Sequence, residues 1–153
     1  MTERTLILIK PDGVQRLLVG RIVERYEQRG LKIVGLKLVH VDRDMAERHY
    51  DVHREKPFFR GLVEFMVSAP LVAICLEGLN AVSVCRAVNG ATRPHEAAPG
   101  SIRGDFALET GQNLVHASDS VDNAASELAL WFGDDELHPY ERDIDRWVDG
   151  SSS

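Results

Sequence analysis

The alternation of apolar and polar residues predicts four short strands. Each predicted strand is bounded by turn-forming residues. The first strand is apolar at nearly every position, which is typical of a strand buried on both faces. The predicted strands are Thr5–Ile9, Lys32–Val41, Leu71–Leu76 and Asn113–His116.

Apolar residues recur at helical spacing between and after these strands. Gly30 is a typical stop for the first helix, and Asp42 or Asp44 can cap the second. Asn80 and Ser120 are expected to cap the last two helices. The predicted helices are Gly20–Arg29, Asp44–His53, Phe59–Val67, Asn80–Val88 and Val121–Phe132.

Two of these helices have a clear inward-facing set of positions. The positions expected to face the core are Ile22, Val23 and Tyr26 in the first helix, and Val121, Ala124, Ala125 and Leu128 in the last. The second and third helices, joined at Pro57, form a hairpin that can stand off a sheet as a lid.

The apolar periodicity of helices and strands also fails at two places within the chain and in its tail. Lys10–Gly13 reads as a turn, because proline fixes φ and glycine allows positive φ. Gly90–Gly111 is expected to be a long loop, and such loops in compact domains are usually functional.

The tail from Gly133 is acidic and irregular. Ile144, Trp147 and Val148 suggest that it docks on the body of the protein or on another subunit. Residues 1–150 are expected to form a single domain, and residues 151–153 a disordered tail.

The order of elements predicts an α+β, ferredoxin-like βαββαβ fold. This plan has a four-stranded antiparallel sheet with helices on one face. Here it would carry a helical hairpin insertion and the long loop before the last strand.

Composition narrows the class of protein. The 153 residues are 44% hydrophobic and 27% charged, as expected for a globular protein. A net charge of -6 argues against a surface that coats nucleic acid, and no apolar run approaches a membrane span. Cys75 and Cys85 are too few for a disulfide scaffold and indicate buried, reduced thiols in a cytoplasmic protein.

His116 is the first candidate for chemistry. It ends the last strand, and a chain reversal at Ala117–Ser120 would let Glu127 reach one of its ring nitrogens. A carboxylate partner fixes the tautomer of an imidazole, as a nucleophile or general base requires. On these residues alone, a cap serine, a surface histidine and a solvated Glu127 remain the more frequent arrangement.

Other polar and aromatic residues fall at strand ends, at the hairpin tip or in the long loop. In this fold those places can converge on one cleft, where arginine, lysine, threonine and asparagine can donate hydrogen bonds to a polyphosphate. An exposed aromatic ring can stack on any base. The candidates are Lys10, Tyr50, Phe58, Arg86, Thr92, Arg103, Asn113 and His116. There is no P-loop motif and no dinucleotide-binding glycine fingerprint.

The chain resembles nucleoside diphosphate kinases over about residues 4–148. The matching segments, quoted from this sequence, are Ile9–Arg16, His49–Tyr50 with Lys56–Phe59, Pro99–Phe106 and Asn113–Ser120. Four specific segments in this order are very hard to obtain by chance.

The resemblance implies a ping-pong phosphotransferase that depends on Mg²⁺. By residue matching, His116 would take the γ-phosphoryl group from a nucleoside triphosphate and pass it to a nucleoside diphosphate. Glu127 and Ser118 would orient His116, and Phe58 would stack on the base. Lys10, Tyr50, Arg86, Thr92, Arg103 and Asn113 would hold phosphates and sugar hydroxyls.

The implied cofactor and assembly follow from the same resemblance. There is no carboxylate cluster for a dedicated metal cage, so Mg²⁺ would arrive with the nucleotide, held by phosphates and water. The family forms hexamers and some tetramers, and the long tail favours a hexamer.

Three positions depart from the family pattern. Ala117, Leu17 and Ala69 stand where glycine is common. If such a position needs positive φ, the side chain costs roughly 1 kcal/mol or more.

Two alternatives to the enzyme remain at the level of sequence. One is a non-catalytic nucleotide-binding or regulatory protein on the same fold, disabled at Ala117. The other is a ferredoxin-like nucleic-acid-binding module, which the acidic charge and the lack of a basic–aromatic strand pattern count against.

Overall fold

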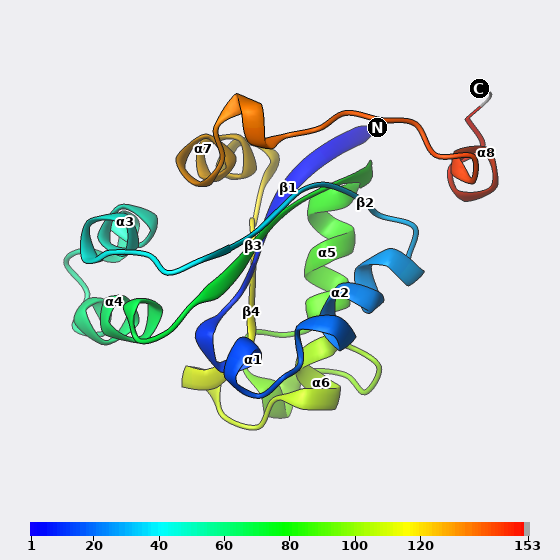
Figure 1. Ribbon diagram of the computed structural model, residues 1–153. Coiled ribbons are helices and arrows are strands. Elements are labelled where there is room, and N and C mark those ends of the chain that lie inside the picture. Colours follow the sequence, from blue (N-terminus) through cyan, green and yellow to red (C-terminus); the bar gives the residue numbers. More distant parts are fainter. Residues whose placement is uncertain (152–153) are drawn as a thin grey trace.

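The computed structural model, described over residues 1–151, contains one four-stranded antiparallel sheet (Figure 1). The strand order is β2-β3-β1-β4, as the βαββαβ plan predicts. Residues 152 and 153 of the expected disordered tail lie outside the described residues. The strands are β1 Thr2–Ile9, β2 Lys32–Val39, β3 Leu71–Leu79 and β4 Val115–Ala117.

Helices cover both faces of this sheet, so the expectation of one covered face is wrong. Helices α2 (Val19–Gln28) and α5 (Ala81–Asn89) cover one face of the sheet. Helices α3 (Arg43–His49), α4 (Phe59–Val67) and α7 (Val121–Trp131) lie on the other (Figure 1). The reason lies in β1, where Leu6 and Leu8 point to one face and Ile7 and Ile9 to the other. All four are fully buried, so each face of β1 needs its own cover.

The second face carries the hairpin and the last long helix. Asp42 caps α3 (Arg43–His49) by accepting from the Met45 amide, and a 3-10 turn, Asp51–His53, follows. The hairpin closes with α4 (Phe59–Val67), and α7 spans Val121–Trp131.

Three segments predicted to lack helices contain short ones. The Lys10–Gly13 turn opens α1 (Pro11–Gln15), with proline at its first position, where its missing N–H costs nothing. The long loop holds α6 (Ile102–Phe106) and 3-10 turns at Pro94–Glu96 and Thr110–Gln112. The tail holds a 3-10 turn at Asp134–Glu136 and α8 (Asp145–Val148). One-turn helices carry too few residues to show a period.

Helix starts agree with the predictions at Ser120 but not at Asn80. The Ser120 hydroxyl accepts from the Asn123 amide at 3.1 Å. Asn80 precedes α5 with a φ of 52° and makes no side-chain cap. Instead, the Glu3 carboxylate accepts from the Val82 amide at 3.1 Å, so a residue from β1 caps α5.

The buried face of α7 also differs from the predicted one. Ala124 and Leu128 are buried as expected, and Trp131 continues this face one turn further. Val121 is 54% exposed, and Ala125 is exposed as well. The predicted set was too wide because alanine and valine are apolar without having to be buried.

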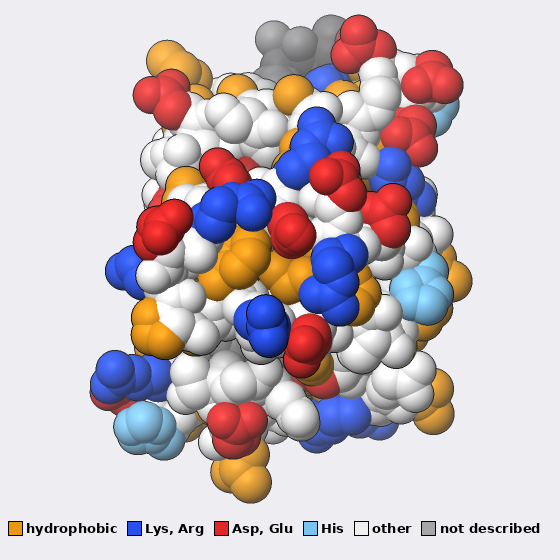
Figure 2. Space-filling model, turned by 90° about the vertical axis from the view of Figure 1, so that its left-hand side faces the viewer, with side chains coloured by type: hydrophobic (Ala, Val, Ile, Leu, Met, Phe, Trp, Pro, Cys, Tyr) orange, Lys and Arg blue, Asp and Glu red, His pale blue; other side chains and the backbone are white. Residues whose placement is uncertain are grey.

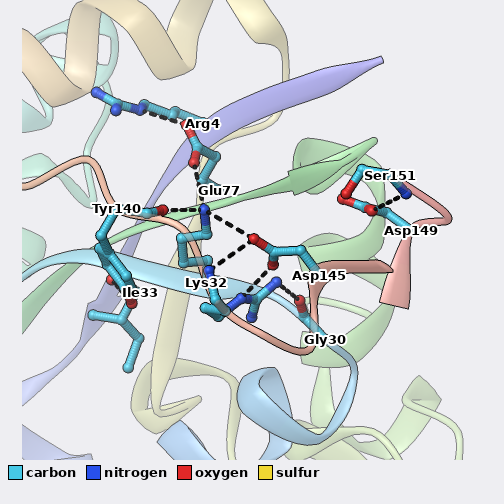
Figure 3. A network of polar contacts seen from close by, with 10 residues as sticks. Arg4, Gly30, Lys32, Ile33, Glu77, Tyr140, Asp145, Asp149 and Ser151 are labelled. Atoms are coloured by element: carbon cyan, nitrogen blue, oxygen red, sulfur yellow. Dashed lines mark hydrogen bonds and ion pairs between the residues drawn. The ribbon is translucent and has the colours of Figure 1, made fainter. Parts of the chain in front are cut away.

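The tail docks along the edge strand β2 (Figure 3). The His138 amide donates to the Val34 carbonyl, and the Tyr140 hydroxyl donates to the Ile33 carbonyl. Lys32 donates to the Tyr140 carbonyl and lies 3.8 Å from the Asp145 carboxylate. The tail thereby covers part of a strand edge that would otherwise be unpaired.

Only part of the apolar tail set joins this docking. Val148 packs against Gly30, whereas Trp147 is 79% exposed and Ile144 is 53% exposed. Ser151 is exposed and belongs to no helix or strand.

The surface on the hairpin side carries interspersed charges. Basic and acidic side chains alternate over the face shown in Figure 2, with hydrophobic side chains between them and no single basic patch. In residues 1–151, no helix has the length and apolar character needed to cross a membrane.

Candidate active site

His116 is positioned by β4 and by an unusual residue just before it. In the sheet, His116 pairs with Leu8 of β1. Leu114 has a φ of 74°, in the left-handed region that leucine rarely adopts. The Lys10 amide donates to the Leu114 carbonyl at 2.8 Å, and the Asp12 carboxylate accepts from the Leu114 amide at 3.1 Å. The start of the chain therefore holds the turn that leads into His116.

The predicted contact between His116 and Glu127 is present. The Nε2 of His116 is hydrogen-bonded to the Glu127 carboxylate, which can only accept, so Nε2 carries the proton. The lone pair of the neutral ring is then on Nδ1. The side chains of His116 and Glu127 are 25% and 19% exposed, so the pair is sheltered but still accessible.

A cavity of about 410 Å³ opens beside His116. Four of the sequence-predicted residues lie in its wall. These are Tyr50, Arg86, His116 and Glu127. Lys10, Phe58, Thr92, Arg103, Asn113 and Ser118 are outside the wall of this cavity.

Arg86 reaches the cavity from α5. Its Nη1 donates to the Ala117 carbonyl at 3.1 Å, next to His116 in the chain, and its side chain is otherwise exposed. Ala117 lies in β4 and does not have positive φ, so its side chain causes no backbone strain beside His116. Of the three departures, only Leu17 has positive φ, at 60°.

Lys10, Asn113 and Thr92 form a chain of polar contacts beside the same strand end. Lys10 Nζ donates to Asn113 Oδ1 at 2.9 Å, and Asn113 Nδ2 donates to the Thr92 carbonyl at 3.1 Å. Burial and, to a smaller extent, the Arg103 charge lower the pKa of Lys10 to about 8, against an opposing effect of Asp12. Lys10 therefore keeps most of its positive charge at neutral pH and is available to an incoming anion.

Arg103 is used mainly by the protein itself. Its guanidinium donates to the carbonyls of Asn113, Gly90 and Val115 at 3.1, 2.8 and 2.5 Å. Arg103 is buried, and burial lowers its pKa to about 10. These three bonds use three of five N–H groups, so two remain for any ligand.

Three other predicted residues have distinct settings. Tyr50 is buried, which raises the pKa of its hydroxyl, and its ring lies edge-on 4.8 Å from that of His49. Phe58 is 49% exposed at the hairpin tip, with the His53 ring 5.4 Å away. The Ser118 hydroxyl accepts from the Leu6 amide at 3.3 Å, so any influence on His116 runs through the strand.

The cavity also contains residues for which sequence reasoning proposed no role. His49 immediately precedes Tyr50, within a matching segment, and His53 lies one turn further on, so their position at the hairpin tip was the available signal. The further lining residues are Arg48, Val52, Asp119, Asn123, Ser126 and Leu130, together with Ala117.

The fold and this cavity define a class of protein. A carboxylate-held imidazole with a free ring nitrogen, facing an arginine-bearing cavity, is the arrangement required for nucleophilic transfer of an anionic group.

Comparison with known proteins gives the family. A family model described as nucleoside diphosphate kinase matches residues 3–137. The chain is 55% identical over 146 residues to a nucleoside diphosphate kinase of Picosynechococcus. The match covers 95% of this chain and 98% of the relative. It is 53% identical to that of Archaeoglobus fulgidus, over 95% of this chain and 97% of that one.

Solved structures agree. A halophilic nucleoside diphosphate kinase from Halobacterium salinarum, in complex with CDP, superposes with a TM-score of 0.94 at 48% identity, over 97% of this chain and 99% of that one. A family protein from Babesia bovis gives 0.93 at 44% identity, over 95% and 99%. The chain belongs to the nucleoside diphosphate kinase family.

Proposed function

We propose that this protein transfers the γ-phosphoryl group of a nucleoside triphosphate, typically ATP, to a nucleoside diphosphate through a phosphohistidine at His116. The observation that carries the proposal is the hydrogen bond between His116 Nε2 and Glu127 beside the cavity. It leaves the Nδ1 lone pair free and gives the ring a carboxylate partner.

The chemistry balances without a further reactant. Nδ1 of His116 bonds to the γ-phosphorus while the bond from that phosphorus to the bridging oxygen breaks, and the diphosphate leaves with the electron pair. Glu127 offsets the positive charge that the imidazole ring gains. A second diphosphate then attacks the phosphohistidine and restores the free ring.

The polar residues around His116 are proposed to bind the nucleotide. Lys10, Arg86 and the two spare N–H groups of Arg103 would neutralise phosphate charge. Tyr50, Thr92 and Asn113 would bond to phosphate or sugar oxygens. Ser118 would help to orient His116 by anchoring β4 to β1.

Base specificity is proposed to be broad. Phe58 is half-exposed at the hairpin tip, where its ring can stack on a base. Stacking is worth about 1–3 kcal/mol per base and tolerates any base.

Mg²⁺ is proposed as the cofactor, bound through the nucleotide. Mg²⁺ prefers oxygen ligands and keeps several waters. Among the cavity residues, Asp119 offers an exposed carboxylate, whereas His49 and His116 offer nitrogen. When bound, Mg²⁺ would neutralise phosphate charge, and Asp119 is the cavity residue that would hold it through water.

The assembly is proposed to be a homo-oligomer, a hexamer rather than a tetramer. Support comes from exposed apolar side chains on the edge strand β2 and in the tail. These are Leu36, Leu38, Ile144 and Trp147. Sedimentation analysis would measure the mass directly.

Two further properties are proposed. Residues 1–150 act as a single domain, which the docking of the tail on β2 supports. A cytoplasmic location is supported by Cys75 and Cys85, which are free and buried.

The test of function is nucleotide exchange with a matched histidine control. His116→Ala should abolish ATP:GDP exchange while circular dichroism and thermal unfolding stay near wild type. His138→Ala, in the exposed tail, should leave exchange unchanged. Retained exchange in His116→Ala would refute the role of His116 as the nucleophile. Bound nucleotide without exchange in the wild type would favour the non-catalytic alternative.

A further inference from the structure

Trp131 and His49 form a contact directly behind the nucleophile. Trp131 Nε1 donates to His49 Nδ1 at 3.1 Å, between residues at the ends of α7 and α3. The His49 ring centroid is 4.7 Å from that of His116, with an interplanar angle of 82°. Trp131 is 2% exposed, so this contact is sheltered from water.

This contact determines the protonation state of His49. The indole N–H can only donate, so His49 Nδ1 must be an acceptor without a proton. A neutral imidazole has one lone pair, and Trp131 occupies it. Protonation of His49 would require that hydrogen bond to be broken, because Nε2 already carries the ring proton.

The surroundings of His49 act in the same direction. Burial lowers the pKa of His49 well below its usual value, and the charges of His116, Lys10 and His53 lower it further. Arg48 and Arg86 line the same cavity. Two carboxylates line this cavity: Glu127, which is already bonded to His116, and the exposed Asp119, which accepts from Asn123.

A neutral neighbour matters because His116 changes charge during the reaction. As Nδ1 bonds to phosphorus, the ring of His116 becomes positive, and Glu127 can balance one charge only. A protonated ring at 4.7 Å would oppose this change. The edge-to-face packing also limits rotation of the His116 ring.

We propose that Trp131 and His49 are positioning residues that hold a neutral imidazole against His116, fixing the orientation of its ring and keeping a second positive charge away from it. This inference rests on the proposed function, because it concerns the phosphorylation of His116.

A metal site is the competing interpretation of the same cluster. Donor atoms of His49, His116 and Glu127 lie within 4.8 Å of one another, and two histidines with a glutamate can bind Zn²⁺. The hydrogen bond from Trp131 occupies the lone pair that His49 would need. The observed contacts therefore favour a positioning role.

The first test uses the wild-type protein. Nitrogen NMR of the imidazole groups should show His49 protonated on Nε2 only and titrating well below the ordinary histidine pKa. Trp131→Phe keeps an aromatic ring but removes the N–H, so His49 should then titrate at a pH higher by about half a unit or more. Titration of His49 near its ordinary pKa in the wild type would contradict the proposal.

The second test measures the rate at which ATP phosphorylates His116 as a function of pH. Trp131→Phe should slow the reaction progressively as the pH falls toward the raised pKa of His49 in the variant, and have little effect above about pH 8, where His49 is neutral in both proteins. In a His49→Phe background, which cannot titrate, Trp131→Phe should change the rate by the same factor at every pH.

The outcomes separate the two proposals. A wild type without a phosphoenzyme would end the proposed function. An active wild type in which Trp131→Phe lowers the rate equally at all pH values would show a purely structural role and overturn this inference. Inhibition of the wild type by Zn²⁺ that His49→Phe relieves would also overturn it, by showing that the His49 lone pair is free.

Discussion

The Asp12 carboxylate accepts a hydrogen bond from the Leu114 amide at 3.1 Å, joining two segments that lie 102 residues apart. Leu114 has a φ of 74° and is fully buried, two residues before His116. The start of α1 thus holds the strained turn that aims the proposed nucleophile. This contact explains why the segment after β1 belongs to the site although Asp12 is outside the wall of the cavity.

Replacement of Asp12 should therefore affect both stability and transfer. Asp12→Ala leaves the buried Leu114 amide without an acceptor, which costs about 1–3 kcal/mol. Asp12→Asn retains an acceptor oxygen and should cost less. Urea unfolding and phosphorylation rates would be measured for both variants, and equal losses in the two would contradict this account of the turn.

Leu17 should be improved by glycine. Its side chain is 89% exposed and its φ is 60°, so removal of the side chain relieves strain without leaving a cavity. Leu17→Gly is expected to raise the unfolding free energy by about 0.5–1 kcal/mol. Leu114→Gly is the matched control at a similar φ. Because Leu114 is buried, this variant should lose about 2–5 kcal/mol of unfolding free energy. A loss of stability in Leu17→Gly would refute the strain argument.

Arg103 should matter more for stability than for nucleotide affinity. Its guanidinium donates to the carbonyls of Gly90, Asn113 and Val115. Lysine cannot reproduce this fork, so Arg103→Lys should lower the unfolding free energy by about 2 kcal/mol or more. The comparison is between the shift in urea midpoint and the change in ADP affinity. An unchanged midpoint with a large loss of affinity would make Arg103 primarily a phosphate ligand.

Nucleotide affinity should fall as the pH rises above about 8. The pKa of Lys10 is about 8, chiefly because of burial, and bound phosphates would raise it. Above that pH the complex therefore binds more protons than the free protein. The expected weakening is at most tenfold per pH unit until the pKa of the complex is reached. Titration calorimetry with ADP from pH 7 to 10 would measure it, and Lys10→Met should remove this component. A flat profile in the wild type would show that Lys10 does not contact the ligand.

The same pKa has a consequence for folding. Lysine in the unfolded chain keeps its proton up to about pH 10.4. Below pH 8, burial of the charged Lys10 opposes folding. Between pH 8 and about 10.4 the folded protein gives up its proton first, so this cost falls and the contribution of Lys10 to stability becomes less unfavourable.

Much of the fold could be predicted because it depends on local patterns. The apolar runs of β1 and β3, the Ser120 cap and the spacing from His116 to Glu127 are all visible along the chain. Features that depend on distant partners could not be predicted. Glu3 caps α5 from another strand, and the positive φ of Leu114 needs Lys10 and Asp12 to hold it.

The site shows the same division. Motifs identified His116, but the neutral state of His49 depends on Trp131, which is 82 residues away. Likewise, the sequence around Arg103 cannot show that three backbone carbonyls take most of the hydrogen-bonding capacity of its guanidinium. Residue types indicate which chemistry is available, whereas contacts decide which of it is left for a ligand.

The most direct test of the central claim is intact-protein mass spectrometry after brief incubation with ATP and Mg²⁺, followed by a chase with GDP. The account predicts a gain of one phosphoryl group on His116 Nδ1 that is lost on the chase and is absent in His116→Ala. Nucleotide binding without any gain in mass, or a gain that persists in His116→Ala, would contradict it.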